Sequence, residues 1–171
     1  MKKIVLLLLL FISSYSYAAL PDDFCGLQLG MSRNEVESIM AKRNLSEINK
    51  TGNTNNASYY AGKNIELYGI LFDEVKIYYD NNNRVEGLAF NLCITYEEGT
   101  HRRIFRALHD EIKPGAKSVK DEHIRYNYLF RFRENQQDRY IRISIKEILQ
   151  GNTGYDIILT YGPTNKRLNA N

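Results

Sequence analysis

The chain has 171 residues, with 23 lysines and arginines against 20 aspartates and glutamates. Its net charge of +3 is too small to indicate capture of nucleic acid through the phosphate backbone, so we expect no nucleic-acid partner. A chain of this length is sufficient for one domain with its own apolar core.

The first 18 residues have the pattern of a secretory signal peptide. Lys2 and Lys3 precede an unbroken apolar run at 4–12, and the small residues Ser16 and Ala18 frame a cleavage site. The apolar run is too short to span a bilayer, which argues against the alternative of an uncleaved anchor. We therefore predict a periplasmic or secreted protein with no stable membrane insertion after cleavage.

Charge is distributed unevenly along the predicted mature chain. Residues 19–95 hold 7 basic and 10 acidic residues, whereas residues 96–171 hold 14 basic and 10 acidic residues. We divide the chain into a signal peptide (1–18), a first helix-plus-sheet unit (19–95), a second such unit (96–163) and a flexible tail (164–171). The basic second half is the part that would meet an acidic partner.

A first helix is predicted from Ser32 to about Asn44. Ser32 and Glu35 form a capping box, in which each side chain accepts a hydrogen bond from the other residue's backbone. Met31 and Val36 have the spacing of a hydrophobic staple, and the glycines at 26 and 30 allow the chain to turn into the helix. Residues 44–58 are rich in asparagine and are expected to form a loop.

Strands are predicted at 65–72, 74–80 and 84–94, with a turn at 80–83 and a bulge at Gly69. A second helix is expected within 97–112, capped by Thr95 or by Thr100, and strands follow at 126–132, 139–146 and 155–161. The predicted fold class is therefore α+β. It comprises two helix-plus-antiparallel-meander units (αβββ-αβββ) in one compact domain.

Two cysteines, Cys25 and Cys93, remain after removal of the signal peptide. In an oxidising compartment a single disulfide between them is the expected state. Two free thiols, one of them reactive, are the alternative.

The stretch GLQLGMSRNEV resembles the helix start of the SmpA/OmlA-type and β-lactamase-inhibitor-protein-like (BLIP-like) families of bacterial envelope proteins. The resemblance is carried by Gly26, Gly30, Met31, Ser32, Glu35 and Val36. It implies helices packed on small antiparallel sheets and a habit of binding other proteins. The lipoprotein cysteine of the assembly lipoproteins is missing, so no particular partner is implied.

Catalytic and metal-binding motifs are missing from the sequence. There is no G-x-S-x-G, S-x-x-K, H-E-x-x-H or C-x-x-C pattern. His101 and His109 are eight residues apart, about 12 Å along a helix, which is too far to ligate one ion directly. We expect no enzymatic activity, no metal and no cofactor.

Basic residues and a tyrosine alternate with the predicted core residues of two neighbouring strands. If Ile141, Ile143 and Ile145 face the core, the intervening residues share the opposite, solvent-facing side of the sheet. We predict that this side binds another protein with an acidic surface, through Arg125, Arg131, Arg133, Tyr140, Arg142 and Lys146. The alternative is a charged surface that only maintains solubility.

The sequence therefore predicts a periplasmic, non-enzymatic protein-binding module, such as an inhibitor or an immunity-type protein. An envelope assembly or structural factor is the alternative, and an uncharacterised hydrolase comes third.

Overall fold

The structure is a computed structural model that describes residues 24–48, 56–95, 99–121, 126–134, 136–148 and 154–163. The predicted signal peptide and the predicted tail lie outside these residues.

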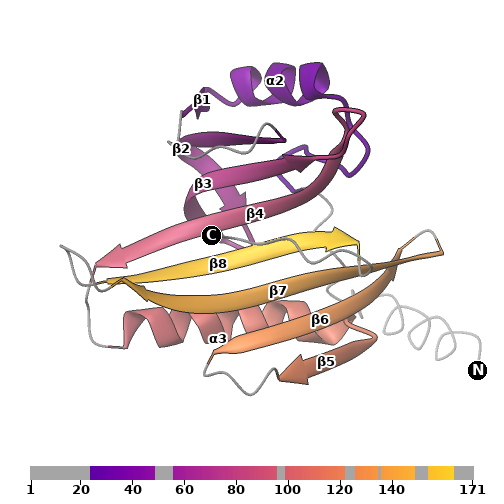
Figure 1. Ribbon diagram of the computed structural model, residues 1–171. Helices are drawn as coiled ribbons and strands as arrows, with labels where there is room; N and C mark the ends of the chain where they lie inside the picture. The colour runs from indigo at the N-terminus through magenta and orange to yellow at the C-terminus, as the bar shows by residue number, and fades with distance from the viewer. Residues whose placement is uncertain are drawn as a thin grey trace, which may run out of the picture.

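One antiparallel sheet of eight strands dominates the described residues (Figure 1). Across the sheet the strands follow the order β1-β2-β3-β4-β8-β7-β6-β5. Each half of the chain thus forms a meander, and the last strand of one meander lies beside the last strand of the other. The strands are β1 (Ser46–Glu47), β2 (Ala57–Leu67), β3 (Ile70–Tyr79), β4 (Val85–Thr95), β5 (Ser118–Asp121), β6 (Asn127–Glu134), β7 (Gln137–Ile148) and β8 (Gly154–Pro163).

The predicted arrangement of two helix-plus-sheet units is wrong. Strands β4 and β8 pair from Leu88 opposite Tyr161 to Thr95 opposite Gly154, which joins the two meanders into a continuous sheet. Separate units would leave β4 and β8 as long unpaired edges, and each half has four strands rather than the three predicted. Pairing these edges satisfies their backbone groups and merges the two expected units.

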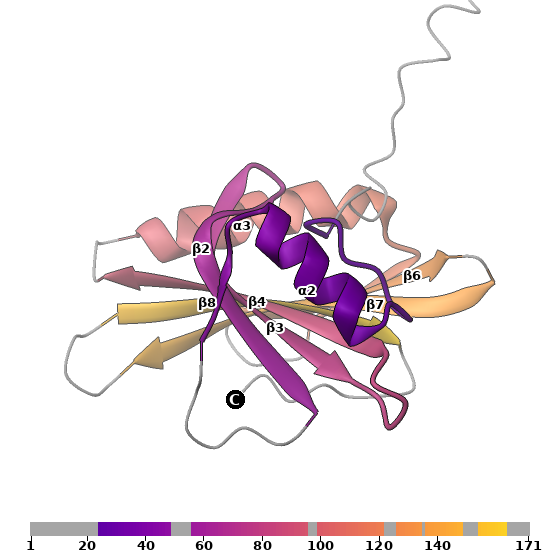
Figure 2. The same cartoon turned by 90° about the horizontal axis from the view of Figure 1, so that it is seen from above.

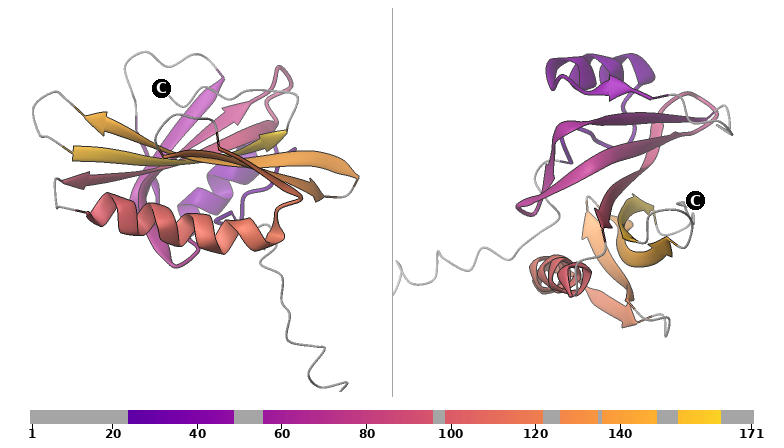
Figure 3. Two further views of the ribbon diagram at one scale, coloured as in Figure 1. Left: turned by 90° about the horizontal axis from the view of Figure 1, so that it is seen from below. Right: turned by 90° about the vertical axis from the view of Figure 1, so that its left-hand side faces the viewer.

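Both helices cover the same face of this sheet, as the views from above and below show (Figures 2 and 3). The register places Phe90, Leu159 and Ile143 side by side on that face. Helix α2 (Arg33–Lys42) and helix α3 (Thr100–Ile112) each contribute buried side chains to the same core cluster. The opposite face carries no helix of the described residues, and we call it the helix-free face.

The predicted start of α2 is confirmed. The Ser32 hydroxyl accepts from the Glu35 amide at 3.4 Å, and the Glu35 carboxylate accepts from the Ser32 amide at 2.7 Å. Hydrogen bonding to Ser32 holds the pKa of Glu35 below its usual value. Val36 is buried in the core, and Met31 packs against the same cluster.

Two hairpins show how turn residues set the strand limits. Asp80 closes the β3–β4 turn as predicted, because its carboxylate accepts from the amides of Asn82 and Arg84 at 2.8 and 2.9 Å. The predicted single strand 65–72 is instead a second hairpin. Tyr68 and Gly69 both have positive φ, at 54° and 71°, so the chain reverses there rather than bulging.

The second meander begins with a strand, β5, that was not predicted from the sequence. Gly99, in the left-handed conformation, is the N-cap of α3, so Thr100 is not the cap and begins the helix. A short 3₁₀ turn, η1 (Lys113–Gly115), follows α3 and leads into β5. Strand β5 has only four residues, all exposed, so it lacks the alternation of buried positions that reveals a strand.

Candidate protein-binding face

The helix-free face is formed by alternate residues of each strand. Ile141 and Ile143 of β7 are fully buried on the helix-covered face, so Tyr140 and Arg142 lie on the helix-free face. The pairing of β6 with β7 sets Arg131 opposite Tyr140 and Leu129 opposite Arg142. The structure therefore brings the predicted residues of these two strands together on one surface.

Basic residues outnumber acidic ones on this surface. On the helix-free face of β5 to β8, five basic residues occur with two acidic residues, which leaves an excess of three positive charges. We call this surface the basic face; its charged residues are Lys120, Arg131, Arg133, Arg142, Lys146, Asp138 and Asp156. The register sets Asp138 opposite Arg133 and Asp156 opposite Lys146, so part of the charge is balanced within the sheet.

The predicted binding residues differ in how accessible they are. Arg131, Arg133 and Lys146 are exposed, and Arg142 is half-buried. Tyr140 was expected to point into solvent, but it is only 5% exposed. It packs among its neighbours, with the Arg142 guanidinium 6.0 Å from its ring centre. Arg125 lies outside the described residues.

Strand β3 adds Lys76 to the helix-free face, together with the Glu74 carboxylate, which accepts from the Asn91 side-chain amide at 3.3 Å. Neither residue was among the predicted binding residues. The Lys76 ammonium lies 4.6 Å from the ring centre of Tyr78 and 5.1 Å from that of Tyr59. Burial lowers the pKa of Lys76, but hydrogen bonds with Tyr59 and Tyr78 outweigh it and leave that pKa above its usual value. Lys76 therefore stays charged at neutral pH and adds a positive group beside two aromatic rings.

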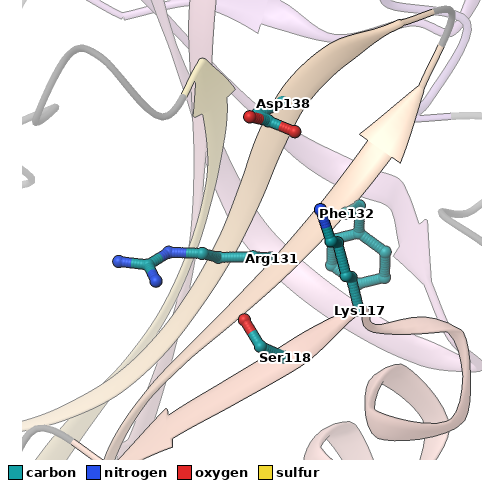
Figure 4. A pocket seen from close by; sticks show the side chains of 5 residues that line it. All are labelled: Lys117, Ser118, Arg131, Phe132 and Asp138. Atoms are coloured by element: carbon teal, nitrogen blue, oxygen red, sulfur yellow. The ribbon is translucent and has the colours of Figure 1, made fainter.

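A pocket of about 380 Å³ opens at one end of the basic face (Figure 4). Lys117 and Ser118 reach it from the start of β5, Arg131 and Phe132 from β6, and Asp138 from β7. Figure 4 shows the Arg131 side chain extending away from Lys117 and across the neighbouring strand. The pocket thus combines two cations, a hydroxyl and a carboxylate around an aromatic ring. Lys117 and Ser118 were not among the predicted binding residues because strand β5 was not predicted.

A second pocket, of about 440 Å³, lies at the start of α2 beside the β3–β4 turn. It is lined by Ser32, Arg33, Asn34, Asn82 and Asn83. Its polar groups serve the fold, since Ser32 caps the helix and the Arg33 guanidinium lies 4.5 Å from the Tyr79 ring centre. We assign this pocket no role in binding.

The structure does not join the two cysteines. Cys25 is 1% exposed in the core on the helix-covered face, whereas Cys93 is an exposed residue of the helix-free face of β4. Burial, followed by the nearby carboxylates of Asp156 and Asp73, raises the pKa of the Cys93 thiol. A disulfide stays a prediction from the sequence, and it would require Cys25 to leave the core and cross the sheet.

The histidines of α3 contact aromatic rings. The His101 ring stacks on Tyr155 with centroids 3.9 Å apart, and burial lowers its pKa. The His109 ring packs against Tyr128 and Phe130, and its Nδ1 lies 2.9 Å from the Asp110 carboxylate. Among the described residues, no group of three or more histidine, cysteine, aspartate or glutamate side chains is placed to hold a metal ion.

The described helices include none with the length and apolar character needed to cross a membrane. Comparison of the chain with protein-family models, with curated proteins and with solved structures found no match.

Proposed function

We propose that this protein is a non-enzymatic binding module that docks an acidic surface of another protein onto its basic face. The observation that carries the proposal is the excess of three positive charges on the helix-free face of β5 to β8. Like charges on adjacent strands repel one another, and an acidic partner removes this cost. Because the sequence predicts a signal peptide, the partner would be a periplasmic or extracellular protein. An enzyme that this protein inhibits, or a toxin that it neutralises, would fit.

The residue types of this surface also support binding. Arginine and tyrosine are enriched among the residues that dominate the energy of protein interfaces, and Arg131, Tyr140 and Arg142 lie together here. Tyr140 is only 5% exposed, so it offers a partner little surface, and the two arginines would make the contact. Charge complementarity of this kind accelerates association and makes it sensitive to salt.

The test is charge reversal on the basic face. Mature protein would be used to capture partners from periplasmic extract, and affinity for the captured protein would then be measured. The double change Arg131→Glu and Arg142→Glu should abolish binding, and added salt should weaken binding of the unchanged protein.

The matched control is Arg102→Glu with Arg106→Glu. Both residues are exposed on α3, on the other side of the sheet, and the change in net charge is the same. Loss of binding in the β6–β7 variant alone supports the proposal. Equal affinity of the two variants would rule out the basic face as the docking surface.

A further inference from the structure

Strand β5 is the edge of the sheet that lies next to the basic face. Among the described strands it pairs only with β6, and its four residues are all exposed. The other edge strand, β1, has two residues and offers little backbone for pairing. A partner that extends the sheet would therefore do so at β5.

The backbone groups of β5 that point away from β6 can be assigned. The amide of Lys117 donates to the Arg131 carbonyl oxygen at 2.7 Å, so the backbone of Arg131 faces β5. Arg131 is opposite Ser118, and backbone groups alternate in direction along a strand. The amide and the carbonyl of Val119 therefore point to the open edge.

The side chains of β5 differ between the two faces of the sheet. Lys120, opposite Leu129, lies on the helix-free face, while Val119, opposite Phe130, lies on the helix-covered face. Val119 is 38% exposed, one of two large apolar residues exposed in the described chain. A strand added beside β5 would thus meet Lys120 and Ser118 on the helix-free face, and Val119 and the Asp121 carboxylate on the other face.

The pocket at Lys117 adds to the difference in charge between the two faces of β5. Lys117 and Arg131 line it where β5 begins, on the side of the basic face. An extended segment lying along β5 would carry its helix-free-face side chains past Lys120 toward Lys117, whereas the Arg131 side chain extends away from this edge. Acidic side chains fit these positions, and apolar ones fit the positions beside Val119.

We propose that the partner contributes an extended segment of alternating acidic and apolar residues, which adds to β5 as a ninth strand. Backbone hydrogen bonds to Val119 would provide affinity, and the charge on Lys117 and Lys120 would select acidic side chains. This inference rests on the proposed function and specifies how the acidic partner is held.

The probe is the peptide TEVEVET, acetylated and amidated, titrated at millimolar concentration into isotope-labelled mature protein. The amide resonances of β5 should shift, and the Val119 amide should gain protection from exchange. The peptide TKVKVKT, with the same alternation and opposite charge, is the control and should leave them unchanged.

Two changes test the backbone bond itself. Val119→Pro removes the amide that points outward and leaves the amides that face β6. Affinity for the peptide should therefore be about tenfold lower than that of Val119→Ala, which corresponds to the loss of one hydrogen bond. N-methylation of each peptide amide in turn should weaken binding at alternate positions only. This second measurement leaves the protein unaltered, so it holds even if the proline variant unfolds.

The inference would be overturned if the β5 amide resonances did not change on addition of TEVEVET, or if TKVKVKT bound with equal affinity. It would also be overturned if the Val119→Pro and Val119→Ala proteins bound TEVEVET equally well. A dimer in sedimentation that depends on β5 would overturn it as well, because a second copy of this chain would then occupy the edge. If Arg142→Glu abolishes capture of a partner while Val119→Pro does not, the proposed function stands and the added strand is rejected.

Discussion

At the scale of single residues, the position of a side chain on the sheet decides its chemistry. Cys25 and Cys93 look equivalent in the sequence, but one is enclosed in the core and the other is exposed. A thiol reacts as its thiolate and only when a reagent reaches it. The two cysteines should therefore respond very differently to the same reagent.

Iodoacetamide should label Cys93 in the folded protein and Cys25 only after unfolding. Because burial, Asp156 and Asp73 raise the pKa of Cys93, labelling should be slow at neutral pH and faster as pH rises. Asp156→Asn removes a negative charge and should lower that pKa and speed labelling. Peptide mass mapping measures each site. Protection of both cysteines until a reductant is added would instead demonstrate the disulfide predicted from the sequence.

The helix cap gives a second residue-scale prediction. Ser32→Ala should cost about 1 kcal/mol of unfolding free energy, the usual contribution of a serine N-cap. Arg43→Ala, at the C-cap of the same helix, should cost less because the capping group there is the backbone N–H, which alanine keeps. Denaturant titration measures both, and equal losses would show that the capping box contributes little.

The same cap should also produce a dependence on pH. The pKa of Glu35 is lower in the folded state than its ordinary value of 4.5. Its contribution is therefore present above 4.5 and is lost as pH falls through the folded-state pKa. Glu35→Gln should show a flatter decline of melting temperature in acid than the unchanged protein, whereas parallel declines would contradict this assignment.

At the scale of elements, helix α3 is attached to the sheet by ring contacts as well as by aliphatic packing. His101 stacks on Tyr155 of β8, and Phe105 packs against Tyr126 and Tyr128. Because His101 is buried, its neutral form is favoured in the folded state. Protonation should loosen the start of the helix.

His101→Phe should keep the stacking and remove the titration. The folded-state pKa of His101 is lowered from 6.5 by burial and then by Arg102, so its contribution is complete above 6.5 and is lost as pH falls below that value. Between about pH 7 and 5 the variant should lose less stability than the unchanged protein. Thermal melts across this range, with His109→Phe as the control, measure it. Identical pH profiles of the two variants would contradict the prediction.

At the scale of the whole molecule, the pairing of β4 with β8 makes one core under both helices. Phe90 of β4 stacks on Phe24 and contacts Phe72, and it belongs to the same cluster as Leu108 of α3. A substitution that destabilises one half of the chain should therefore also destabilise the other half.

Phe90→Ala should cost about 3–5 kcal/mol and lower the stability of both helices together. Hydrogen exchange measured by mass spectrometry should show α2 and α3 losing protection in parallel, and unfolding should occur in a single transition. Survival of protection in α3 after α2 has exchanged would instead indicate two independent units.

The sequence predicted the elements better than their assembly. The capping box at Ser32, the turn at Asp80 and the burial of Ile141 and Ile143 in β7 each depend on residues close together in the chain, and all three are confirmed. The hairpin at Tyr68 was missed because a non-glycine residue takes a positive φ there. Strand β5 was missed because no buried residue marks it.

In the candidate site too, some features could be predicted from the sequence and others could not. Alternation along β6 and β7 identified Arg131 and Arg142 as residues of one face, because the period of a strand is a local property. The burial of Tyr140, the contacts of Lys76 and the pocket at Lys117 depend on how neighbouring strands pack, which alternation along one strand does not record.

By itself, therefore, the sequence determined the start of α2, most of the strands and the side of β6 and β7 that carries positive charge, since these follow from local hydrogen bonding and periodicity. Only the tertiary structure decided that the two halves share one sheet, that Cys25 and Cys93 lie on opposite faces, and that β5 is an edge of the described sheet beside the basic face. The reason is that which strand edges pair is settled by contacts between distant segments, and no pattern within a single segment records that choice.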